Sequence, residues 1–171
     1  MAHDWTSLIK SEIESTYHAT EGLMKMVDPT SLAWKPATGS NWMTTGQLLD
    51  HLTNACGACM KGFVTGDWGI PADAPPEAML PPAEKLPAVK SVADAQAKLA
   101  ADKQVALAML AKAGEKDLAG KSVDAPWDPT KKPLGLQMLH MVNHLQQHKG
   151  QLFYYLKLQG KPVHTGSLWG M

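Results

Sequence analysis

The chain has 171 residues, a length typical of one domain, and its 44% hydrophobic content is enough for a sizeable core. Sixteen basic residues balance sixteen acidic ones, so no overall field attracts nucleic acid or an acidic membrane. All sixteen basic residues are lysines, which lack the planar fork that binds phosphate at two points. The composition therefore favours a protein that acts on a small-molecule substrate, with no nucleic acid and no membrane as partner.

The apolar runs are short, and the two cysteines are close together in the sequence. No run approaches the roughly 18–20 apolar residues that span a bilayer, and the first residues do not resemble a secretory signal. We therefore expect a cytoplasmic protein with reduced thiols. Cys56 and Cys59 fall within a predicted helix, where neither a redox pair nor a structural zinc site is favoured, so we interpret them as packing residues.

Four segments have the three- and four-residue spacing of apolar side chains that is typical of helices, and none alternates like a strand. The four predicted helices are Asp4–Val27, Thr45–Val64, Val92–Ala113 and Leu134–Gln159. Asp28-Pro29 ends the first, and a capping box of Thr44 and Gln47 opens the second. The pattern predicts an all-α protein.

The connection from Thr65 to Lys90 holds six of the twelve prolines. A connection of this length without secondary structure is unusual inside a compact domain. A long crossover permits two consecutive helices to run parallel, whereas a short loop makes them antiparallel. We therefore interpret this segment as a crossover between the second and third helices and not as a linker between domains.

The last predicted helix carries three histidines at a spacing of four residues: His140, His144 and His148. Four residues advance about 400° around a helix, so these side chains lie near one another. His148 falls inside the apolar stripe, His144 about 40° from it, and His140 another 40° further out. The position on the helix therefore favours His144 and His148 as an inward pair that binds one divalent metal, which would relieve the repulsion of two buried imidazoles.

Two histidines leave a metal under-coordinated, and His51 on the second predicted helix is the candidate for the third ligand. It flanks the apolar stripe on a ridge of small residues, which lets another backbone approach: Ala55, Ala58 and Gly62. The alternative is that the histidine run is an exposed polar face, or polar packing without a metal. We expect His3, His18 and His164 to have no functional role.

The stretch from Asn143 to Gln151 resembles the closing Asn-His-x-x-x-His-Arg-Gly-Gln signature of the DinB-like family of metalloenzymes, with Lys149 where the family commonly has Arg. The stretch from Trp42 to Leu52 resembles the second-helix segment of that family, in which a histidine supplies the remaining ligand. Short matches around Trp34 and Leu156 extend the resemblance over nearly the whole chain. From Thr65 to Trp127 only the placement of the helices matches.

The resemblance implies one domain over residues 1–171, folded as a four-helix bundle with an up-down-down-up path. It also implies a three-histidine site at His51, His144 and His148 that holds one zinc or nickel ion. Characterised relatives include metal-dependent transferases that act with low-molecular-weight thiols.

Three histidines without a fourth protein ligand describe an open site, as catalytic zinc uses. No carboxylate is predicted beside them, since Asp50 lies about 100° round the helix from His51, so we assign no catalytic acid or base. This favours a metal-dependent enzyme of the thiol S-transferase type. A non-catalytic metal-binding stress-response protein and a metal-dependent hydrolase are the alternatives.

The outer side of the last predicted helix carries apolar residues that no other predicted element covers: Leu139, Phe153 and Tyr154. Uncovered apolar surface favours association between copies of a chain. Relatives in the family that the chain resembles often pair in this way. We therefore expect a homodimer.

Overall fold

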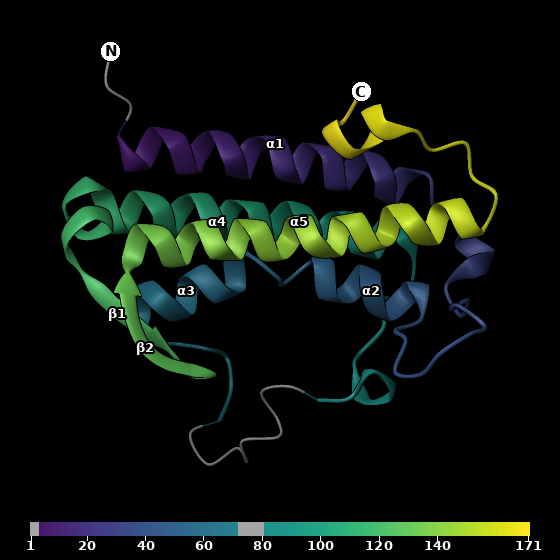
Figure 1. Ribbon diagram of the computed structural model, residues 1–171, viewed down its shortest axis with the longest axis horizontal. Helices are drawn as coiled ribbons and strands as arrows, with labels where there is room; N and C mark the ends of the chain where they lie inside the picture. The colour runs from purple at the N-terminus through teal and green to yellow at the C-terminus, as the bar shows by residue number, and fades with distance from the viewer. Residues whose placement is uncertain (1–3, 72–80) are drawn as a thin grey trace.

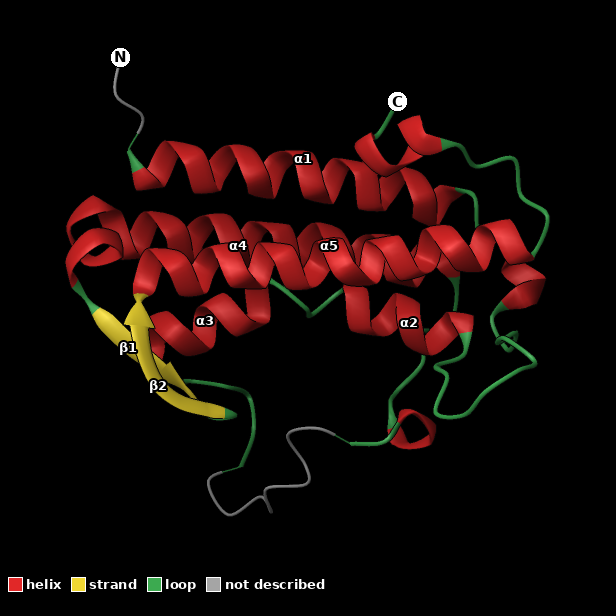
Figure 2. Cartoon of the chain, in the orientation of Figure 1, coloured by secondary structure: helices red, strands yellow, loops and turns green. Residues whose placement is uncertain are grey.

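The computed structural model describes residues 4–71 and 81–171, and most of these residues are helical (Figures 1 and 2). The α-helices are α1 (Trp5–Lys25), α2 (Thr45–Leu52), α3 (Gly57–Thr65), α4 (Val92–Gly120) and α5 (Leu134–Leu158). Short 3-10 helices are η1 (Pro29–Ser31), η3 (Ala83–Lys85) and η4 (Thr165–Trp169). The prediction of a mainly helical protein is confirmed.

The long helices α1, α4 and α5 lie side by side, and α2 and α3 lie end to end beneath α5 (Figure 1). Each helix turns its apolar stripe toward the others, as the periodicity predicts. Fully buried large side chains of this shared core include Ile9, Ile13, Leu23, Met24, Leu48, Leu49, Leu52, Met60, Leu118 and Leu134. The core thus sets α2 and α5 against each other, which places their histidines in contact range.

The second predicted helix is not continuous, because α2 ends at Leu52 and α3 begins only at Gly57. Cys56 offers α3 no side-chain cap, and the cap comes instead from Asp102 on α4. The Asp102 carboxylate accepts hydrogen bonds from the backbone N–H of Gly57 at 2.9 Å and of Ala58 at 2.8 Å. A Cβ at Gly57 would lie 2.1 Å from the Asp102 carbonyl oxygen, so glycine is what permits this approach. The single helix from Thr45 to Val64 was therefore a wrong prediction.

The third predicted helix, Val92–Ala113, ends where the sequence predicts, because Gly114 has a φ of 65° and a ψ of 167°, which are not helical. A second helical segment, which the sequence did not predict, follows this kink within α4 as far as Gly120 and buries Leu118 completely.

A two-stranded antiparallel hairpin, which the sequence did not predict, joins α4 to α5. Its strands are β1 (Ser122–Ala125) and β2 (Asp128–Pro133). Both strands are short and mostly exposed, so they lack the alternation of apolar and polar residues that identifies a half-buried strand. Pro126 and Trp127 form the turn between them.

The predicted crossover begins and ends close to the expected residues. Gly66 caps α3 in the left-handed conformation, and Ser91 caps α4 by accepting from the backbone N–H of Asp94 at 3.0 Å. Residues 72–80 of the crossover lie outside the described residues. Gln47 at the start of α2 donates to the carbonyl oxygens of Ala83 and Leu86, so the later part of the crossover is attached beside α2.

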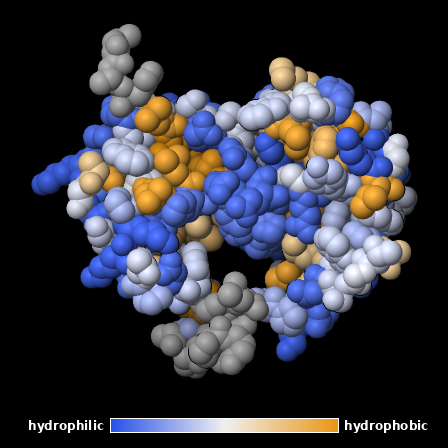
Figure 3. All heavy atoms as spheres, viewed as in Figure 1, coloured by the Kyte–Doolittle hydropathy of each residue, from blue (hydrophilic) through white to orange (hydrophobic). Residues whose placement is uncertain are grey.

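The outer face of α5 is less apolar than expected. Phe153 is buried at 4% exposure, with the ammonium of Lys157 4.9 Å from its ring centre, so the prediction that Phe153 lies on the surface was wrong. Tyr154 is 65% exposed, and Leu139 is partly buried. Figure 3 shows hydrophilic side chains over the middle of this face of the molecule. Within the described part of the chain, no helix has the length and apolar character that crossing a membrane requires.

Candidate metal centre

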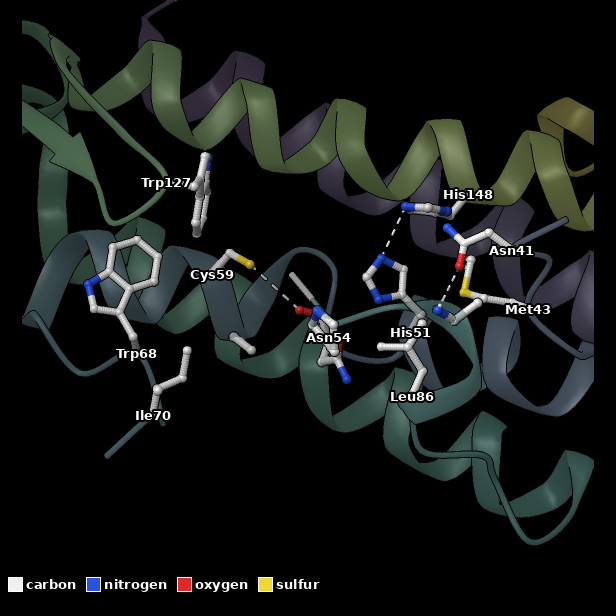
Figure 4. A pocket seen from close by; sticks show the side chains of 13 residues that line it. Asn41, Met43, His51, Asn54, Cys59, Trp68, Ile70, Leu86, Trp127 and His148 are labelled. Carbon is white, nitrogen blue, oxygen red and sulfur yellow. Dashed lines mark hydrogen bonds between the residues drawn. The ribbon is translucent and has the colours of Figure 1, made fainter. Parts of the chain in front are cut away.

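Three histidines from two helices meet at one point. His51 lies in the last turn of α2, and His144 and His148 lie on successive turns of α5. The Nε2 atom of His51 is 3.3 Å from that of His144 and 3.0 Å from that of His148, and the last two are 3.1 Å apart. The three side chains are half-buried and form a group that can hold a metal ion. Figure 4 shows His51 and His148 turned toward each other, joined by a dashed line.

The break between α2 and α3 fixes the tautomer of His144. The carbonyl oxygen of Ala55, within the break, lies 3.0 Å from Nδ1 of His144. A carbonyl only accepts, so Nδ1 carries the proton and donates it. Neutral imidazole has one proton, and the Nε2 atom of His144 therefore presents a lone pair to the centre.

The side-chain amide of Gln151 fixes the tautomer of His148 in the same way. The Oε1 atom of Gln151 lies 3.0 Å from Nδ1 of His148. An amide oxygen only accepts, so Nδ1 carries the proton and donates it. The Nε2 atom of His148 thus also presents a lone pair.

The donor set and its spacing fit a metal ion. Two lone pairs that face each other at 3.1 Å, on His144 and His148, repel unless a cation lies between them. Nitrogens bound to one ion at about 2.0–2.1 Å, at angles from 90° to tetrahedral, lie about 2.8–3.4 Å apart. The three observed separations fall inside that range. Outer hydrogen bonds such as those to Ala55 and Gln151 are the usual way in which proteins orient histidine ligands.

The surroundings favour neutral imidazoles. Burial, followed by the charges of His148 and His144, lowers the pKa of His51 to about 4. Burial and the charge of His148 lower the pKa of His144, although its bond to Ala55 opposes the shift. Burial also lowers the pKa of His148, against the opposing effect of Gln151. Only a neutral imidazole binds a metal, so the site is prepared for one at neutral pH.

These lowered pKa values predict how the stability of the metal-free protein depends on pH. Between about pH 6.5, the pKa of a histidine in the unfolded chain, and about pH 4, the unfolded state binds more protons than the folded state. The free energy of unfolding is therefore expected to fall as the pH drops through this window. Urea unfolding of metal-free protein at pH 7, 6 and 5 measures the slope. Replacement of His51 by Gln should make the slope shallower, and an equally steep slope in that variant would contradict the assignment.

His51 and His148 form part of the wall of a pocket of about 570 Å³, a volume typical of small-molecule sites. Among the described residues that line it, none has a charged side chain, and the polar ones are Asn41, Asn54 and Cys59 beside the two histidines. Asn41 has a positive φ of 59°, and its Oδ1 atom accepts from the backbone N–H of Ala83 at 3.0 Å. The histidine group therefore opens onto a cavity and is not sealed by packing.

The other histidines that the structure describes lie outside the group, as predicted for His140. His140 is outside the group, and its Nδ1 atom lies 3.4 Å from Oε1 of Gln137. His18 is exposed, and His164 caps η4 at the surface. His3 lies outside the described residues.

The two cysteines have different surroundings. Cys56 is a fully buried packing residue, as expected. Cys59 is only partly buried and lines the pocket, so the prediction of a packing role was incomplete. Burial, with a smaller effect of the Asp102 charge, raises the pKa of the Cys59 thiol to about 11, which keeps it protonated at neutral pH. The thiolate is the nucleophilic form of cysteine, so these surroundings do not activate Cys59.

Sequence reasoning missed several groups that build the site. Gln151 was detectable, because a residue three positions after His148 on a helix lies beside it. The Ala55 carbonyl was not, since its exposure depends on a helix break imposed by Asp102. Trp127 reaches the pocket only through the unpredicted hairpin.

Comparison with known protein families identifies the fold family. A family model described as the DinB superfamily matches residues 12–152, a stretch that contains His51, His144 and His148. Comparisons with curated proteins and with solved structures gave no significant match. The matched residues make up well over half of the sequence, and the chain therefore belongs to the DinB superfamily.

Proposed function

We propose that this protein is a metal-dependent enzyme of the thiol S-transferase type, in which His51, His144 and His148 hold one zinc or nickel ion. The observation that carries the proposal is the convergence of three Nε2 atoms at the wall of an open pocket whose described residues include no carboxylate. Three protein ligands leave a coordination position for a substrate. When bound, the ion supplies a Lewis acid that favours the thiolate form of a substrate thiol.

The residues of the chain prepare this site before a substrate arrives. Ala55 and Gln151 hold the two α5 histidines in the tautomer that directs their lone pairs inward, so no reorientation is needed. In the proposed transfer the thiol loses its proton to solvent and its sulfur forms a bond to carbon of the second substrate. The leaving group then departs with the bonding electron pair.

The pocket supports this function over the two alternatives. A purely metal-binding stress protein has no need of a cavity of about 570 Å³ beside the histidines. A hydrolase commonly uses an acid or base near the attacked bond, and the described pocket residues offer no carboxylate for that role. The low-molecular-weight thiol is therefore the preferred substrate.

Two further proposals concern the architecture of the fold and the association of the chains. We propose an up-down-down-up four-helix bundle in which α2 and α3 together take the place of one helix, and a cytoplasmic homodimer. Support for the dimer comes from the last turns of α5, where Tyr154 and Leu158 are 65% and 66% exposed.

Thiol consumption tests the proposed function. Protein purified without a His tag and reloaded with zinc or nickel is mixed with cysteine or glutathione and an electrophile such as chlorodinitrobenzene. We expect the metal-loaded protein to accelerate thioether formation, and the metal-free protein and His148→Ala to show only the background rate. His140→Ala is the matched control on the same helix and should retain the activity. Equal rates with and without metal for every thiol tested would refute the proposal.

A further inference from the structure

The pocket beside the histidines has two ends of different chemistry. Figure 4 shows His51, His148 and Asn41 at one end and Trp68, Ile70 and Trp127 at the other. Between them lie the uncharged groups of Cys59 and Asn54. The metal centre accounts for the first end and gives no role to the second.

The far end is built from aromatic rings that pack edge to face. The ring centroids of Trp68 and Trp127 are 5.4 Å apart, with 77° between their planes. Buried Phe63 supports both rings, at 4.9 Å from Trp68 and 6.2 Å from Trp127. Gly62 permits the close packing of Trp68, because a Cβ at position 62 would lie 2.2 Å from the indole. The rings are therefore held in position by the fold and do not depend on a ligand to order them.

These rings nevertheless leave apolar surface open. Trp127 is 44% exposed and Ile70 is 37% exposed, although both line the cavity. Trp127 stands in the two-residue turn of the hairpin, a position that β-turns usually fill with small or polar residues. A large indole at such a turn, directed into a cavity, is poorly explained by packing alone.

We propose that Trp68, Ile70 and Trp127 form a subsite for an uncharged aromatic ring. The described pocket residues carry no charged side chain, so a charged group on the ring would lose its hydration without gaining an ion-pair partner. Two indoles at a steep angle offer one ring a stacking face and an edge contact together. This ring belongs to the electrophilic second substrate, an assignment that rests on the proposed function.

Equilibrium binding of 2-naphthol to the metal-free protein tests the subsite, with 2-naphthoate as the charged analogue of the same ring system. We expect saturable binding of 2-naphthol and binding of 2-naphthoate that is at least about tenfold weaker, since naphthoate buries an unpaired charge. Trp127→Ala and Trp68→Ala should each weaken the binding of 2-naphthol by about tenfold or more. Trp127→Lys should bind 2-naphthoate more tightly than 2-naphthol, because the lysine ammonium pairs with the carboxylate of 2-naphthoate.

Trp169→Ala is the matched control, because Trp169 is 69% exposed and does not line the pocket. This variant should bind 2-naphthol with the affinity of the wild type. Circular dichroism of each variant verifies folding. The subsite would be overturned if the wild type does not bind 2-naphthol, or if Trp127→Ala binds 2-naphthol as tightly as the wild type does. Equal affinities of Trp127→Ala and Trp127→Lys for 2-naphthoate would also overturn it. Because the titration uses no metal, binding that Trp127→Ala removes supports the subsite even if thiol consumption fails, whereas thiol consumption without naphthol binding refutes only the subsite.

Discussion

Replacement of His51 or His148 by alanine is expected to abolish stoichiometric binding of zinc or nickel. Each variant leaves two nitrogens from a group whose three Nε2 atoms lie within 3.3 Å of one another. Loss of an outer hydrogen-bond partner commonly costs about 10–100-fold in metal affinity, and loss of a direct ligand should cost more. Elemental analysis after reloading and gel filtration measures the effect. In the wild type, bound metal should also raise the melting temperature, because it binds only the folded state.

Two further variants make this experiment specific. Gln151→Ala removes the acceptor that orients His148, so its affinity should lie between those of the wild type and His148→Ala. His140→Ala tests the neighbouring histidine of the same run, which lies outside the group, and should bind one ion per chain. Full metal content in His51→Ala would refute a site shared between α2 and α5. Loss of bound metal in His140→Ala alone would show that His144 and His148 are not the ligand pair on α5.

The ligand candidates could be predicted from the sequence because their positions depend mainly on helical periodicity. A spacing of four residues places His144 and His148 on one face of any helix, and the apolar stripe shows which face turns inward. Their outer partners could not all be predicted in this way. The partner of His148 is Gln151, three residues further along the same helix, whereas that of His144 is a backbone carbonyl in a break that no local sequence pattern predicts.

The fold likewise contains elements that could be predicted from local sequence and elements that could not. Capping residues such as Thr44 and Ser91 act on their own helix, and the helix starts that they predict are confirmed. The break before α3 and the hairpin after α4 have tertiary causes. Gly57 looks from the sequence like one weak position within a helix, and only the approach of α4 makes it a helix start. The hairpin strands are too exposed to carry a periodic signal.

Asp102 links the fold to the metal centre. Its carboxylate caps the start of α3 and so maintains the helix break in which the Ala55 carbonyl faces His144. Its carboxylate accepts from the Tyr17 hydroxyl at 2.5 Å as well as from the two backbone N–H groups that begin α3. It is 6% exposed, and burial raises the pKa of its carboxyl, an effect that the bond from Tyr17 and the backbone N–H groups oppose. A buried acceptor with several donors is costly to remove, because each donor is left unpaired.

Asp102→Ala is therefore expected to lower the free energy of unfolding of the metal-free protein by about 3–5 kcal/mol, since two buried donors and one partly buried donor lose their acceptor together. Tyr17→Phe removes one donor with its bond and should cost only about 1 kcal/mol. Asp117→Ala, an exposed carboxylate on the same helix, should change stability by no more than about 0.5 kcal/mol. Urea unfolding of the three variants measures these differences. A loss below about 1 kcal/mol in Asp102→Ala would mean that α3 begins at Gly57 without this cap, and that the Ala55 carbonyl reaches His144 for another reason.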